Sequence, residues 1–112
     1  MIMAIKVNQF VEAGEKFEYK ATKAIAYHGI VVSGALVGVA TKAAVVDEVI
    51  SCDAVGVYAL DKTSGEAIAQ GAVVYVTTAG KITATAGSNT RAGIAWAAAA
   101  TSDATVLVKL NA

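Results

Sequence analysis

Glycine turns divide this chain into short runs that are rich in Val, Ile, Thr and Tyr. Such residues favour strands, whereas glycine readily adopts the positive backbone angles that tight turns need. Short runs separated in this way are typical of an antiparallel β-sandwich or β-barrel. We therefore expect an all-β fold, a small antiparallel barrel or sandwich. The turns that carry the pattern are Ala13-Gly14, His28-Gly29, Ser33-Gly34, Ser64-Gly65, Ala79-Gly80 and residues 86–89.

Alternation of apolar and polar residues marks two half-buried strands. Phe17, Tyr19 and Ala21 fall on one face of the first. Near the end of the chain, the face formed by Val106, Val108 and Leu110 lies opposite Thr105, Leu107 and Lys109.

Residues 73–85 predict a hairpin whose turn fixes its register. A two-residue Ala79-Gly80 loop would require a positive φ at Ala79, which is costly for a residue with a Cβ. A three-residue loop with Gly80 in the left-handed conformation pairs Val76 with Ile82 and Tyr75 with Thr83.

Three other segments call for a decision between helix and strand. The spacing of apolar residues changes near residues 65–70, where we expect one short helical turn that begins after Ser64 and stops at Gly71. Residues 24–41 carry no charge, but their glycines and β-branched residues favour buried strands and turns over a membrane span. The alanine-rich run at 95–100 is interpreted as a strand into Trp96 followed by a loop.

No internal boundary is visible, since the chain has no proline, no low-complexity linker and no charge block. We expect one β domain over residues 11–112, preceded by an arm at residues 1–10. Apolar Ile2, Met3 and Ile5 suggest that this arm adds to the sheet edge of a neighbour.

Composition favours association with another protein. Hydrophobic residues make up 56% of the chain and charged residues only 16%, which leaves apolar surface for a partner. Nine basic and nine acidic residues give a net charge of zero, and the basic residues are scattered. This balance argues against nucleic acid and anionic membranes as partners.

Catalytic and metal-binding patterns are missing from the sequence. A single histidine, His28, sits in a turn between apolar segments, and Cys52 is followed by Asp53, which would raise a thiol pKa. We expect a structural or solvent-facing histidine and a cysteine in the core. With one His and one Cys, no closed zinc site can form. The sequence therefore predicts no enzyme, no cofactor and no metal.

Two single residues are candidates for protein contact. Trp96 is the only tryptophan and is interpreted first as a core anchor, with an interface hot spot as the alternative. Arg91, the only arginine, is interpreted as a free surface residue that could also reach a carboxylate on a neighbour. The opening residues do not form a secretory signal, and the lone cysteine suits a reducing compartment, so we expect synthesis in the cytosol.

Taken in order, several glycine-flanked strands resemble the capsid cement, or head decoration, proteins of tailed bacteriophages. The resemblance covers most of the chain, although proline, which is common in the family near positions such as 60–62, is absent. The segments that carry it are 34–40 (GALVGVA), 56–62 (GVYALDK), 71–75 (GAVVY), 93–95 (GIA) and 104–110 (ATVLVKL).

The resemblance implies a structural protein on the outside of a phage head. Such a protein binds the major capsid protein, bridges capsid subunits against internal DNA pressure and acts as a homodimer or homotrimer. Two other functions stay open at this point. One is a small ligand-binding β-barrel with a pocket lined by Tyr58, Tyr75 and Trp96, and the other is a phage tail or baseplate module.

Overall fold

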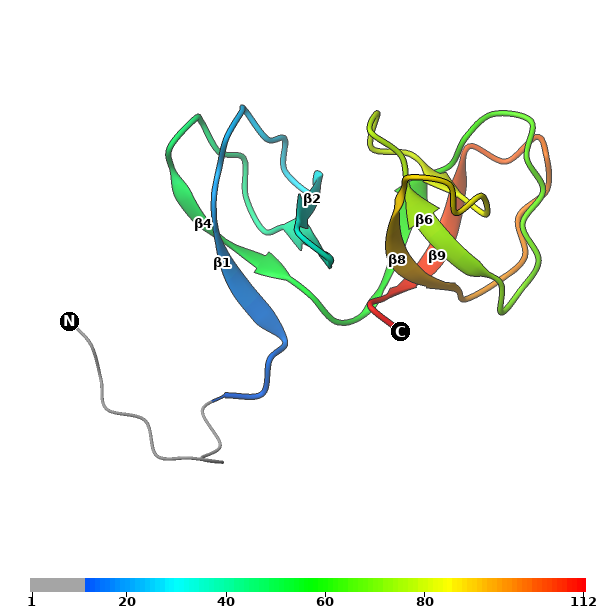
Figure 1. Ribbon diagram of the computed structural model, residues 1–112, viewed down its shortest axis with the longest axis horizontal. Helices are drawn as coiled ribbons and strands as arrows, with labels where there is room; N and C mark the ends of the chain where they lie inside the picture. The colour runs from blue at the N-terminus through cyan, green and yellow to red at the C-terminus, as the bar shows by residue number, and fades with distance from the viewer. Residues whose placement is uncertain (1–11) are drawn as a thin grey trace.

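A computed structural model describes residues 12–112, and every regular element in this part of the chain is a β-strand. The strands form two antiparallel sheets that lie side by side as two lobes (Figure 1). The N-lobe, residues 15–54, holds a four-stranded sheet in the order β1-β4-β3-β2. Its strands are β1 (Lys16–Lys20), β2 (Ile30–Ser33), β3 (Leu36–Ala40) and β4 (Val49–Asp53).

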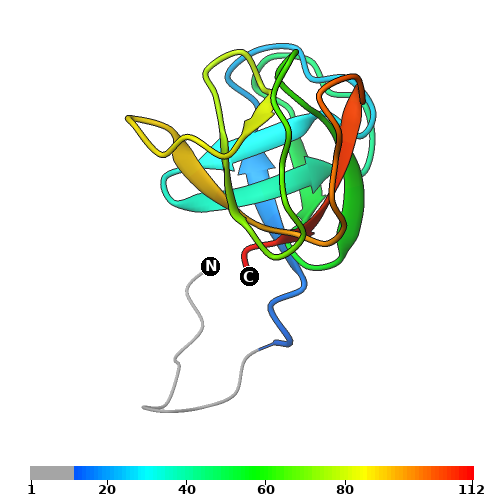
Figure 2. The ribbon, with the colours of Figure 1, turned by 90° about the vertical axis from the view of Figure 1, so that its right-hand side faces the viewer.

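The C-lobe, residues 56–111, holds a five-stranded sheet in the order β5-β9-β8-β6-β7. This sheet curls on itself, as the end-on view shows (Figure 2). Its last strand returns to its first, since Ile82 forms a parallel bridge with Lys62 and its carbonyl accepts from the Thr63 N–H at 3.0 Å. The strands are β5 (Val57–Asp61), β6 (Val73–Val76), β7 (Ile82–Thr83), β8 (Thr90–Ala95) and β9 (Thr105–Leu110).

The all-β expectation is confirmed, and so are the main strand predictions. The hairpin has the predicted register, with Val76 opposite Ile82, Tyr75 opposite Thr83 and Gly80 at φ 79°. Inward residues alternate with outward ones along β9, and Val106, Val108 and Leu110 are buried.

The short helical turn predicted near residues 65–70 is wrong. Ile68 instead forms an antiparallel bridge with Ala99, because its buried side chain is needed in the C-lobe core. Across residues 12–112 we find no helix with the length and apolar character that crossing a membrane requires.

Two apolar clusters form the interior. The larger one fills the C-lobe and also takes in Val37 and Val39 of β3, so β3 packs against both lobes. The smaller one lies in the N-lobe and is built mainly of small residues: Ala21, Val31, Ala40, Ala44, Ile50 and Cys52.

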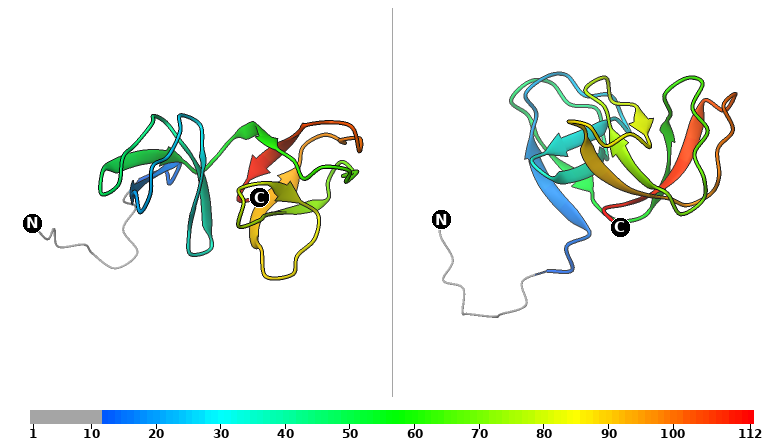
Figure 3. Two further views of the ribbon diagram at one scale, coloured as in Figure 1. Left: turned by 90° about the horizontal axis from the view of Figure 1, so that it is seen from above. Right: turned by 45° about the vertical axis from the view of Figure 1, so that its right-hand side comes forward.

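The two lobes repeat one supersecondary unit. The order β1-β4-β3-β2 in the N-lobe corresponds to β5-β9-β8-β6 in the C-lobe. Both units place a glycine of the third strand opposite a buried valine, Gly38 opposite Val31 and Gly93 opposite Val74. The view from above shows both units around the connection at residues 54–56 (Figure 3).

Loop contacts confirm this internal duplication in detail. The isolated bridge Ile25–Ala44 corresponds to Ile68–Ala99. The bond from Ala40 N to Gly29 O (2.9 Å) corresponds to that from Ala95 N to Ala72 O (2.9 Å), and Ala54 N to Glu15 O (2.8 Å) to Leu110 N to Gly56 O (2.9 Å).

One element has no counterpart. A two-residue Gly34-Ala35 turn joins β2 to β3, whereas a longer connection that includes β7 joins β6 to β8. The C-lobe is therefore closed by an added strand, and the N-lobe is left without it.

Candidate contact surface

The outer face of the C-lobe carries exposed apolar side chains on neighbouring strands. Trp96, directly after β8, is 52% exposed, and its backbone N–H donates to the carbonyl of Leu107 at 2.7 Å. Leu107 is 40% exposed and lies opposite exposed Ala59, while Val57 on the same strand is 41% exposed. We call Val57, Ala59, Trp96 and Leu107 the Trp96 patch.

The first interpretation of Trp96, as a core anchor, is wrong. Ala95 occupies the inward position at the end of β8, so the next side chain points outward. The Lys109 ammonium lies 5.9 Å from the centroid of the Trp96 ring, which adds a cation–π contact at the edge of the patch.

A second exposed apolar group lies on the N-lobe. Val45, Val46 and Val49 are 68%, 54% and 53% exposed, and we call them the valine turn. The turn is held by Glu48, whose carboxylate accepts from the Val45 N–H at 3.1 Å. The salt bridge from Lys42 (2.5 Å) lowers the pKa of the Glu48 carboxyl and so favours its charged form.

The duplicated unit provides an internal comparison for this turn. In the C-lobe, Asp103 accepts from the Ala100 N–H at 2.8 Å in the equivalent turn. That turn carries Ala100, Thr101 and Ala104 in place of exposed valines. The turn geometry therefore does not require apolar residues, and the valines are available for contact.

The remaining predicted contact residues divide into two groups. Arg91 is exposed, and its Nε and Nη2 donate to the oxygen of Ala112 at 3.3 and 2.8 Å, which ties the last residue to β8. Ile2, Met3 and Ile5 lie outside the described residues, and their role stays a prediction.

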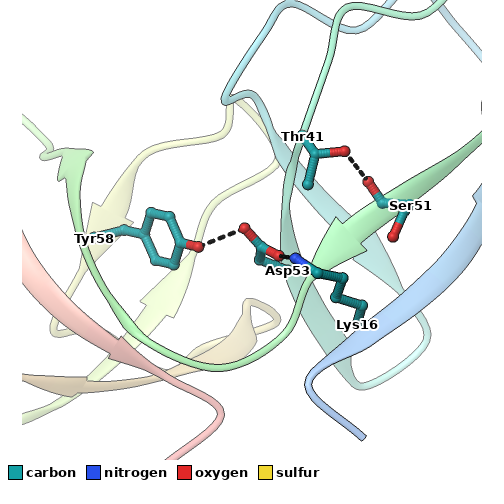
Figure 4. A network of polar contacts seen from close by, with 5 residues as sticks. All are labelled: Lys16, Thr41, Ser51, Asp53 and Tyr58. Atoms are coloured by element: carbon teal, nitrogen blue, oxygen red, sulfur yellow. Dashed lines mark hydrogen bonds and ion pairs between the residues drawn. The ribbon is translucent and has the colours of Figure 1, made fainter.

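A polar network holds the two lobes together (Figure 4). Asp53, at the end of β4, pairs with Lys16 and accepts from the Tyr58 hydroxyl at 2.6 Å. Both bonds lower the pKa of the Asp53 carboxyl, and the bond from Lys16 has the larger effect. The same carboxylate raises the pKa of Tyr58 to about 12, because the hydrogen bond requires the protonated phenol. Nearby, the Thr41 hydroxyl donates to the Ser51 carbonyl at 2.8 Å.

Asn111 makes the second connection between the lobes. Its Nδ2 donates to the carbonyls of Val37 (2.8 Å) and Ala54 (2.7 Å), and its Oδ1 accepts from the Val37 N–H (3.3 Å). Its φ of 56° is one that asparagine tolerates better than most residues. We call Lys16, Asp53, Tyr58 and Asn111 the lobe clasp.

The single histidine of the chain lies in an exposed turn, and the single cysteine lies in the core. His28 is exposed, stacks on Tyr27 with ring centroids 3.8 Å apart and occupies a turn at φ 63°. Cys52 is fully buried, and burial, followed by the charge of Asp53, raises its pKa away from the reactive thiolate. Within residues 12–112, no three His, Cys, Asp or Glu side chains gather as a metal site would require.

The aromatic residues proposed for a ligand pocket do not converge. Tyr58 packs against the C-lobe core, and its hydroxyl donates a hydrogen bond to Asp53. Tyr75 lies on β6 between inward Val74 and Val76, so it points to the other face, as Trp96 does. The geometry therefore gives no support to a barrel that binds a small molecule between these rings.

Sequence reasoning missed the valine turn and most of the Trp96 patch. An apolar residue at an outward position of an alternating strand, such as Leu107, was the available signal.

Comparison with known proteins gives one family match. The family model described as phage cement protein matches residues 11–110. No curated protein and no solved structure matches the chain. The match covers nearly the whole chain and names a family of structural capsid proteins. The chain therefore belongs to the phage cement protein family.

Proposed function

We propose that this protein binds the outer surface of the phage head and bridges neighbouring major capsid subunits. Membership of the cement family makes it a structural protein of the capsid that stabilises the shell. The observation that carries the finer proposal is one exposed apolar surface on each lobe, the Trp96 patch and the valine turn. Two separate contact surfaces on one chain are what a bridging protein needs.

The lobe clasp supports bridging because it fixes the spacing of the two surfaces. A rigid connection lets both surfaces engage without loss of much conformational freedom, so the second contact gains from a high effective concentration. The hydrogen bond from Tyr58 to Asp53 and the three bonds of Asn111 cross between the lobes and supply this rigidity. Force applied between capsid subunits would then be carried across the β3–β8 junction.

Other properties of the proposal follow from the low charge and apolar surface of the chain. Its partners are the major capsid protein and further copies of itself, as a homodimer or homotrimer, with neither nucleic acid nor membrane involved. The protein is made in the host cytoplasm and added to the head exterior. Residues 1–10 act as an arm of the β domain at 11–112, and exposed Arg91 is a further candidate for contact.

Co-sedimentation with expanded heads tests the proposal. Trp96→Ala removes the largest exposed anchor, and loss of a hot spot of about 2 kcal/mol lowers affinity about 30-fold. Tyr27→Ala is the control, because Tyr27 is an exposed aromatic residue (63%) that belongs to neither the Trp96 patch nor the valine turn. Both variants should melt like the wild type. Unchanged binding by Trp96→Ala and by Val46→Asp would contradict the proposal.

A further inference from the structure

The N-lobe has an open groove at the place where the C-lobe is closed by β7. The groove has a volume of about 560 Å³ and is lined by Tyr19 and by residues 22–26 and 29–32 of the N-lobe. Its other wall is formed by residues 76–80 and 88–90 of the C-lobe. By the duplication, residues 19–22 and 30–32 correspond to the residues of the C-lobe that hold β7.

In the C-lobe, β7 fills this position with one apolar side chain. Ile82 is completely buried, and the strand pairs with β6 on one side and bonds to Thr63 on the other. The residues around it are covered, with Leu60 at 5% and Ile68 at 2% exposure. Their N-lobe counterparts, Tyr19 and Ile25, line the groove and stay only partly buried.

Backbone groups at the groove are also left open. The Asn111 side chain bonds both the N–H and the C=O of Val37, so these groups do not pair with β2. Val32, directly opposite Val37, therefore points its own N–H and C=O to the free edge. It corresponds to Tyr75, which pairs with β7. Among residues 12–112, no backbone carbonyl is found to accept from the N–H of Thr22, the counterpart of Thr63.

We propose that this groove accepts an extended strand from the N-terminal segment, residues 1–11, of a second copy of the chain. This inference rests on the self-association proposed above and gives it a site. The strand takes the place of β7 antiparallel to β2, with an apolar residue in the position of Ile82. Ala4-Ile5-Lys6 resembles Lys81-Ile82-Thr83 in presenting one isoleucine among residues suited to the outer face.

The position of β1 favours a second copy over the chain's own segment. The groove is lined by Tyr19 and residues 22–26, at the Lys20 end of β1, whereas residues 1–11 precede the Lys16 end of this strand in the sequence. Figure 1 labels β1. A chain that fills its own groove must fold back along β1, which is about 16 Å long at 3.3 Å per residue. Exchange between copies removes this reversal and links them at the sheet edge.

Proline at the open edge tests the groove. Val32→Pro removes the outward N–H without loss of a bond to β3, because proline is tolerated where the N–H faces away from the sheet. Glu18→Pro is the matched control on β1, the other edge strand of the same sheet, where Glu18 lies between residues whose N–H and C=O groups face β4. We expect the wild type and Glu18→Pro to be oligomers, and Val32→Pro and a chain lacking residues 1–10 to be monomers, by sedimentation equilibrium.

Cross-linking keeps the test decisive if Val32→Pro fails to fold. Lys6 takes the position of Thr83, which lies opposite the Val32 counterpart Tyr75. Chains carrying Lys6→Cys alone and Val32→Cys alone are therefore mixed and oxidised, and a disulfide-linked heterodimer is expected. A doubly substituted chain that closes only on itself, an oligomer that survives Val32→Pro, or a monomeric wild type would each overturn the inference. Wild-type binding to heads is measured separately, so an oligomer that ignores heads refutes the proposed function and leaves this inference standing.

Discussion

Removal of the Asn111 side chain should weaken the junction between the lobes more than any other single polar change. Asn111→Gly keeps a backbone that accepts φ 56° and deletes three hydrogen bonds. Val37 is completely buried, so its N–H and C=O lose their partners without free access to water. At about 1 kcal/mol net for each bond, the free energy of unfolding should fall by about 3 kcal/mol.

Urea denaturation measures this loss, and thermal melting should show a decrease of about 12 °C at roughly 4 °C per kcal/mol. Asn89→Gly is the control, because it deletes one exposed bond to the Thr85 carbonyl (3.1 Å) within a single loop. Its cost should stay below about 1 kcal/mol. Trp96 fluorescence reports on the C-lobe alone and circular dichroism on both lobes, so the two transitions should coincide in the wild type and separate in Asn111→Gly. If Asn111→Gly lowers the free energy of unfolding no more than Asn89→Gly does, Asn111 does not hold the two lobes together.

Two further predictions concern the clasp and the paired glycines. Tyr58→Phe should cost about 1 kcal/mol at pH 7 through its lost bond to Asp53. Because the pKa of Asp53 is lowered in the fold, this difference should shrink as pH falls below about 4. In alkali, the stability that depends on protonated Tyr58 should be lost as pH rises from about 10 toward 12, and a spectroscopic titration should lose its phase near 12 in the variant. Gly93→Ala should yield no folded protein, because a Cβ there would lie 1.9 Å from the Lys109 carbonyl oxygen at φ 151°. Gly38→Ala, at the equivalent position, would place a Cβ 2.6 Å from the Phe17 ring and 3.0 Å from the Asp53 carbonyl oxygen, so it should cost about 1–3 kcal/mol in a urea titration. A Gly93→Ala protein as stable as Gly38→Ala would contradict the backbone clash predicted at Gly93.

Much of the fold was predictable because strand alternation and turn chemistry are local. The register of the β6–β7 hairpin followed from Gly80 alone, and the inward face of β9 followed from Val106, Val108 and Leu110. The helical turn near 65–70 failed because a cap, a short apolar pair and a glycine describe one turn of helix and a tight bridge equally well. The bridge partner, Ala99, lies far along the chain and leaves no local signal.

The contact surfaces were less accessible to sequence reasoning. Trp96 seemed a core residue because large aromatic residues are usually buried, and only the placement of Ala95 in the interior decides otherwise. The valine turn has the composition of a strand and is exposed because Glu48 closes it into a turn. The duplication was visible in principle, in the repeated Ala-Ile-Ala at 24–26 and 67–69 and in Gly-Val-Ala at 38–40 against Gly-Ile-Ala at 93–95. Such short similarities indicate a duplication only when the equivalent backbone hydrogen bonds of the two lobes coincide as well.

Duplication also accounts for the apolar character of the chain. A repeated unit that closes on itself, as the C-lobe does, needs β7 and a polar clasp in which Lys62 donates to the carbonyls of Thr63 and Glu66. The N-lobe has Ala21 at the position of Lys62 and a two-residue turn at the position of β7, so it retains apolar side chains without an internal cover. The C-lobe is thus closed by β7, whereas the N-lobe lacks an equivalent strand and stays open at the edge of β2. An unfinished sheet is unfavourable in a solitary monomer, because its edge and its half-covered core face water. The proposed exchange of N-terminal segments would remove both costs, because the segment of a second copy would cover the edge and the core together.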